Sequence, residues 1–115
     1  MFFDWGSYAY YIRPGFTDMR CGCEALARIV VSDMGLDVHS RSMFLFLSKS
    51  RRTLAVLVWD RNGFWLMRKR LSAGTFPWPK DGKDAIPFTV DDICRLLEGN
   101  DVFRRLPTLP GGMLL

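Results

Sequence analysis

Two kinds of apolar spacing alternate in the first third of the chain, and each predicts its own element. A tyrosine-rich run at residues 7–12, followed by a Pro-Gly turn, is typical of a short strand. Apolar side chains then recur at steps of three and four residues over 23–34, which is the spacing of one helix face. We expect Thr17 or Asp18 to cap this helix and Gly35 to end it.

Three apolar runs of strand length follow, at residues 43–47, 54–59 and 64–67, and they are rich in valine or aromatic residues. Residues 49–52 are expected to form the first turn. Asn62-Gly63 is expected to form the second, because this dipeptide readily supplies the two positive φ angles of a type I′ hairpin. The pattern predicts an antiparallel meander.

The position of the second turn predicts the register of its hairpin. A two-residue loop at the Asn-Gly dipeptide pairs Arg61 with Phe64, and the pairing then continues along both strands. On this register, Arg61, Arg68 and Arg70 project from one face beside Trp59. The hairpin would then present a basic surface with an aromatic ring that could stack on a base.

A segment at residues 74–79 interleaves aromatic rings with prolines, which excludes a helix and favours an extended strap. Two roles fit this strap. It could bury Phe76 and Trp78 against the sheet, or it could offer them to a partner protein. Because large rings are usually well buried, the first role is favoured.

Residues 89–92, Thr-Val-Asp-Asp, resemble a capping box and predict a last helix that ends before Gly99. The fold class is therefore α+β, with a small antiparallel β-meander of three to four strands packed with two helices. Residues 1–106 are expected to form a single domain. Residues 107–115, which are rich in Pro and Gly, are expected to be a flexible tail.

Composition limits the kinds of protein that the chain can be. Its 115 residues suit one domain, and 49% hydrophobic with 24% charged residues is typical of a folded protein. No apolar run approaches the length of a spanning helix, and the first residues lack a signal pattern. We expect a cytoplasmic protein that does not interact with a membrane and whose three cysteines stay reduced.

Candidate chemistry is sparse in this sequence. Cys21 and Cys23 have Cys-x-Cys spacing, and His39 is the single histidine, so we expect no metal site. The carboxylates are separated, and neither phosphate-binding glycine motif occurs. We therefore expect a protein without catalytic residues, without a cofactor and without a small-molecule substrate.

Positive charge is concentrated in the middle of the chain. The net charge is +4, and the segment from Arg41 to Arg70 contains eight basic residues and a single acidic residue, Asp60. These side chains could neutralise phosphates, or they could protect the edges of a sheet from further strand pairing. The candidate nucleic-acid contacts are Arg51, Arg52, Arg61, Arg68, Lys69 and Arg70, and the candidate partner-binding rings are Trp59, Phe76 and Trp78.

Several short motifs occur in a characteristic order. Asp-Met-Arg at residues 18–20 precedes the first helix, Trp-Asp-x-x-Gly spans 59–63, and Lys-Arg-Leu at 69–71 comes before Phe-x-Trp-Pro at 76–79. From Tyr8 to Gly99 the chain thereby resembles the TnpB-like, or Orf2-like, accessory proteins of the insertion sequence 66 family.

The resemblance implies an accessory factor for DNA transposition, encoded beside a larger transposase that carries the catalytic acids. DNA and that transposase are therefore the expected partners. The leading hypothesis is binding to DNA or to a transposase–DNA complex through the basic hairpin face. The alternatives are an interaction module that bridges transposition proteins without touching DNA, and an inactive copy whose product folds without a function.

Overall fold

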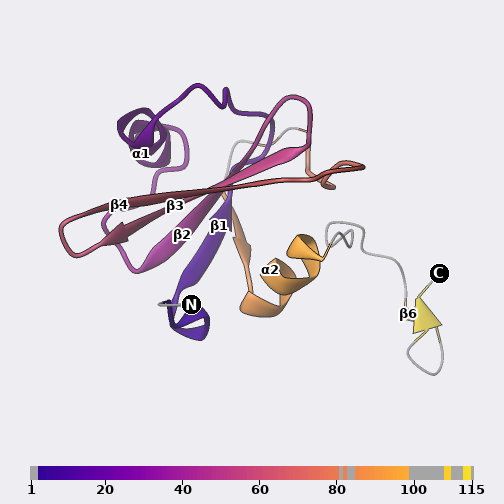
Figure 1. Ribbon diagram of the computed structural model, residues 1–115. Helices are drawn as coiled ribbons and strands as arrows, with labels where there is room; N and C mark the ends of the chain where they lie inside the picture. Colours follow the sequence, from indigo (N-terminus) through magenta and orange to yellow (C-terminus); the bar gives the residue numbers. More distant parts are fainter. Residues whose placement is uncertain (1–2, 81, 83–84, 99–107, 110–112, 115) are drawn as a thin grey trace.

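A five-stranded sheet with one helix on each face forms the body of the protein (Figure 1). The computed structural model describes residues 3–80, 82, 85–98, 108–109 and 113–114. Along the chain, a 3-10 turn at Trp5–Ser7 precedes β1 (Ala9–Ile12), α1 (Cys23–Ser32), β2 (Ser42–Leu47), β3 (Thr53–Asp60), β4 (Gly63–Arg70), β5 (Ile86–Phe88) and α2 (Val90–Leu97). A separate ribbon of β6 (Thr108–Leu109) and β7 (Met113–Leu114) follows.

The expected α+β class is confirmed, and β2, β3 and β4 form the expected antiparallel meander. β1 does not continue this antiparallel arrangement, because it runs parallel to β2, with Tyr11 beside Phe44. The connection from β1 to β2 contains α1. Parallel neighbours need such a crossover. The sequence patterns also missed β5, an edge strand that pairs only with β1 and so tolerates Pro87.

The β3–β4 hairpin has a different register from the expected one. Asp60 pairs with Gly63, so the loop residues are Arg61 and Asn62, and Arg61 takes the left-handed conformation with φ 55°. This register sets the rings of Trp59 and Phe64 directly opposite each other, with centroids 5.0 Å apart, a stabilising cross-strand pair. The shift moves every pair by two positions, so the side chains within the two strands keep their expected faces, whereas Arg61 moves from the strand into the loop.

The start of α1 was also predicted wrongly. Gly22 is its N-cap, and no side chain caps it, whereas Thr17 and Asp18 belong to the preceding linker. The backbone N–H of Thr17 donates to Leu47 O at 2.8 Å, which ties that linker to the end of β2. The helix also ends earlier than expected, at Ser32 with Asp33 as its C-cap, and Gly35, with φ 68°, follows in the next loop.

The second helix begins where its capping box predicts. Asp92 N donates to Thr89 Oγ1, and Thr89 N donates to Asp92 Oδ2, both at 3.1 Å. Its apolar residues Ile93 and Leu96 are buried. The expected stop at Gly99 and the domain boundary at residue 106 lie outside the described residues.

Each face of the sheet has its own core. On one face, α1 packs Leu26 and Val30 against apolar side chains of β2, β3 and β4. On the other face, α2 packs against β1 and β5, and the core continues over β2 and β3. Within the part of the chain that the structure describes, no helix has the length and apolarity needed to cross a membrane.

Candidate nucleic-acid interface

The three consecutive basic residues at the end of β4 point to both faces of the sheet, because side chains alternate along a strand. Arg68 and Arg70 lie on the α1 face, where Arg68 Nη2 donates to Cys21 O at 3.1 Å. Lys69 lies on the α2 face, and its Nζ donates to Leu97 O at 2.8 Å. Lys69 therefore does not join the two arginines in one surface.

Arg61 and Trp59 occupy the opposite end of the hairpin from Arg70. The eight residues of β4 separate the two ends by about 24 Å. Arg61 lies 3.5 Å from the carboxylate of Asp60, and the Trp59 ring meets His39 edge-on with centroids 4.6 Å apart. Arg61 and Trp59 thus form no common surface with Arg70.

Arg51 and Arg52, in the turn between β2 and β3, hold the strap that follows β4. Arg51 Nη2 donates to Phe76 O at 3.2 Å, while Arg52 Nη2 donates to Ser72 O at 2.9 Å and to Leu71 O at 3.3 Å. Both side chains are half-buried, and the Nε atom of each is buried without a hydrogen-bond partner among the described residues. This geometry gives both arginines a structural role.

The strap buries the two rings that the sequence offered as partner contacts. Phe76 is fully buried, and Trp78 is 6% exposed. The indole Nε1 of Trp78 donates to Arg13 O at 2.8 Å, which fastens the strap beside the end of β1. Of the two roles considered for this segment, the structure therefore shows the first, burial of the rings against the sheet.

Exposed cations nevertheless gather on the α1 face, around the linker 13–22. This linker leaves β1, runs beside the end of β2 and reaches Arg68 at Cys21, so it crosses one end of the sheet. It brings Arg20 to the surface next to the turn that carries Lys49. We call the exposed side chains at this end the basic patch, which consists of Arg20, Lys49, Arg68 and Arg70.

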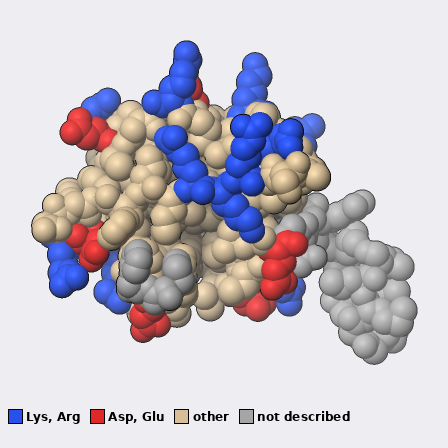
Figure 2. Space-filling model, viewed as in Figure 1, with Lys and Arg blue, Asp and Glu red and all other residues tan. Residues whose placement is uncertain are grey.

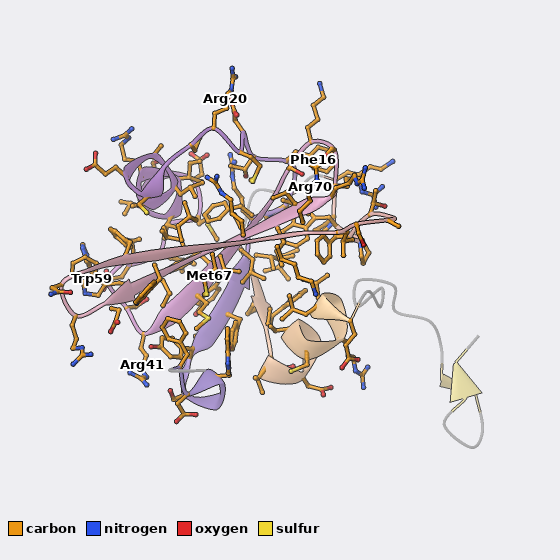
Figure 3. The ribbon with its side chains drawn as sticks, in the orientation of Figure 1. Phe16, Arg20, Arg41, Trp59, Met67 and Arg70 are labelled. Atoms are coloured by element: carbon orange, nitrogen blue, oxygen red, sulfur yellow. The ribbon has the colours of Figure 1, made fainter. Side chains whose placement is uncertain are left out.

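The figures show the same concentration of charge. Lys and Arg side chains crowd the upper part of the face in view, with few acidic side chains beside them (Figure 2). Arg20, Phe16 and Arg70 lie at this end, whereas Trp59 lies at the far end of the hairpin (Figure 3). Neither the Lys49 nor the Arg70 side chain has a hydrogen bond or ion pair with another described residue, and both side chains are exposed.

One carboxylate belongs to this surface. Asp18 accepts hydrogen bonds from the guanidinium of Arg20, at 2.7 Å to Nη2, and from its backbone N–H at 2.9 Å. These bonds lower the pKa of Asp18 to about 2 and raise the pKa of Arg20. Asp18 is therefore ionised at neutral pH and offsets part of the positive charge.

An open groove of about 470 Å³ lies on the linker side of the patch, lined by Arg20, Lys49, Asp18 and neighbouring residues that include Phe16. Phe16 is 40% exposed. Sequence reasoning did not select Phe16, Arg20 or Lys49 as site residues. Lys49 lay within the basic segment and Arg20 within the Asp-Met-Arg motif, but nothing in the pattern distinguished Phe16.

No three His, Cys, Asp or Glu side chains come together as a possible metal site within the described ranges. Fold and surface thus define a small α+β protein with a mixed sheet and a positively charged end. The chain belongs to the IS66 Orf2-like family, since the model described as IS66 Orf2 like protein matches residues 8–106. The resemblance found in the sequence is confirmed, and it places the protein in insertion-sequence transposition, in a family that is not known to be catalytic.

Two relatives come from Sinorhizobium fredii (strain NBRC 101917 / NGR234). The uncharacterized protein y4hO is 36% identical over 91 residues, which cover 79% of each chain. The uncharacterized protein y4jC is 29% identical over 84 residues, which cover 73% of this chain and 72% of its own. No solved structure matches the chain.

Proposed function

We propose that the protein is a non-catalytic accessory factor of transposition that binds the DNA backbone through the basic patch. The observation that carries this proposal is the gathering of four exposed cations at one end of the α1 face, of which only Arg20 is paired with a carboxylate, in a member of a transposition family. Cations that neutralise phosphates release condensed counterions, and this release drives binding without regard to sequence. The element's transposase, in the cytoplasm, is the proposed protein partner.

The arrangement of the backbone supports a continuous track for phosphates. Thr17 N donates a hydrogen bond to Leu47 O, and Ser48 N donates one to Thr53 O. Thr53 in turn pairs with Arg70 in the β3–β4 hairpin. These contacts set the linker, β2, β3 and β4 side by side over three interstrand spacings, or about 14 Å. Cations at both ends and in the middle of this row could contact successive phosphates.

The test is salt-dependent binding of purified protein to a duplex oligonucleotide, measured by fluorescence anisotropy. In Arg68→Gln/Arg70→Gln, the slope of log affinity against log salt should become shallower by about 0.9 for each lost contact, or about 1.8 in total. The matched control, Arg61→Gln/Arg95→Gln, removes the same charge from distant sites. Its slope should stay closer to the wild-type slope than that of the patch variant. Equal losses in both variants, or no duplex binding at all, would contradict the proposal.

A second candidate function is a protein-interaction module that does not touch DNA, and the exposed ring of Trp65 favours it. This ring lies on the α2 face, is 44% exposed and contacts Phe3 edge-on. Transposase capture that survives nuclease treatment and is lost in a folded Trp65→Ala variant would support this function. Capture that requires DNA would instead support binding through the basic patch.

A further inference from the structure

We propose that the basic patch takes single-stranded DNA, with one unpaired base stacked on the ring of Phe16. This inference rests on the proposed function and names its ligand. Phe16 is one of four large apolar side chains that are clearly exposed in the described part of the chain, with Val31, Trp65 and Val90. Of these four, only Phe16 lines the groove that holds Arg20 and Lys49.

The backbone on both sides of Phe16 is fixed. Gly15 N donates to Pro79 O at 2.9 Å, and Gly15 has a positive φ of 78°, which favours glycine. On the other side, Thr17 N donates to Leu47 O, and the buried Thr17 hydroxyl accepts a hydrogen bond from Arg13. The chain therefore presents this ring from a rigid support, which reduces the entropy that binding would cost.

The surroundings of Phe16 indicate which kind of ligand would cover its exposed ring. The cations Arg20 and Lys49 line the same groove, together with Asp18, which is paired with Arg20, and Arg70 lies at the same end of the molecule (Figure 3). A nucleotide combines a flat apolar face with a phosphate, and proteins that bind single strands pair aromatic platforms with basic grooves for this reason. A purely apolar ligand would leave these cations unused.

The same geometry disfavours an intact duplex as the ligand of Phe16. Bases inside a duplex are stacked on each other and show only their edges, so their faces cannot reach a protein ring. An unpaired base has a free face. A row of about 14 Å between the linker and β4 has room for a few nucleotides of one strand. Duplex DNA would use the cations alone.

The experiment compares a fluorescently labelled oligothymidine strand with a labelled duplex in the same anisotropy assay. Wild-type protein should bind the single strand more tightly than the duplex. Phe16→Ala should weaken single-strand binding by between about five- and 150-fold and leave duplex binding unchanged, because stacking on one base is lost. Phe16→Trp should restore the affinity, and Trp65→Ala, which removes an exposed ring from the other face, should change neither affinity.

The outcomes separate this inference from the proposed function. Salt-dependent duplex binding without a preference for the single strand would overturn the stacking inference and leave the proposed function standing. Equal loss of both affinities in Phe16→Ala would also overturn it. Absence of binding to either probe would contradict both the stacking inference and the proposed function. Because Phe16 is exposed, circular dichroism and thermal unfolding should show that its variants fold like the wild type.

Discussion

Replacing Arg52 by alanine tests whether this arginine holds the strap or contacts DNA. Its Nη2 atom donates to the carbonyl oxygens of Leu71 and Ser72, at 3.3 and 2.9 Å. In the folded alanine variant both carbonyls lose this donor. The backbone bond from Leu71 N to Arg52 O, at 2.8 Å, does not involve the side chain and should remain. The change therefore removes only the side-chain part of the attachment.

The expected loss of stability follows from these two bonds. Hydrogen bonds from a charged donor contribute about 1.5 kcal/mol or more each, and the bond to the exposed Ser72 is weakened by solvent. The buried Nε of Arg52 has no partner among the described residues, so its removal offsets about 1 kcal/mol. We expect a net loss of about 1.5 kcal/mol, or a fall in Tm of about 8 °C. Arg52→Lys keeps the charge without the planar group and should lose about half as much.

The assay combines thermal unfolding with DNA binding at a temperature where all variants are folded. Arg52→Ala and Arg52→Lys should lower Tm while the salt slope of duplex binding stays at the wild-type value. Arg70→Ala serves as the opposite control, since Arg70 is exposed and should affect the slope but hardly the Tm. An Arg52→Ala variant with unchanged Tm and a slope shallower by about 0.9 would refute the structural role.

Two further predictions follow from the shifted pKa values. Asp18→Asn removes the carboxylate that neutralises Arg20, so it should tighten DNA binding and steepen the salt slope by about 0.9; weaker binding would show that Asp18 positions Arg20 for the ligand. Burial raises the pKa of Tyr10 to about 12 from its ordinary 10.0, so the contribution of this group to stability should be intact below pH 10 and should fall by about 2 kcal/mol as the pH rises to about 12. Tyr10→Phe loses the bond to Trp5 O at every pH but should lack this alkaline fall, and parallel denaturation profiles for the two proteins would contradict the burial argument.

Local patterns predicted the elements whose causes are local. The capping box at Thr89 and the apolar spacing of the two helices depend on residues within a few positions, and the structure has them where expected. The meander of β2, β3 and β4 likewise follows from short runs joined by short turns. The parallel placement of β1 could not be found this way, since it depends on a crossover of some thirty residues that only the folded sheet defines.

The hairpin register shows how a local rule can be overridden. The Asn-Gly dipeptide favours a loop at its own position, but the structure places the loop one residue earlier, at Arg61 and Asn62. The rings of Trp59 and Phe64 then pair across the strands, and Asp60 accepts a hydrogen bond from Trp65 Nε1 at 2.9 Å. Contacts between side chains on two strands therefore outweighed the preference of the turn.

The candidate site was the least predictable part, because its residues come from three separate segments. Strand alternation sends Arg68 and Arg70 to one face and Lys69 to the other, although the three are consecutive in the sequence. The linker then adds Arg20 to the face where Arg68 lies, through a crossover that no local pattern encodes. A count of basic residues along the chain thus measures how much charge is present, whereas the sheet and the linker decide which charges can act on one ligand. For this reason, variants that exchange charge between the two faces at constant net charge are a stricter test of the proposed DNA interface than variants that only reduce it.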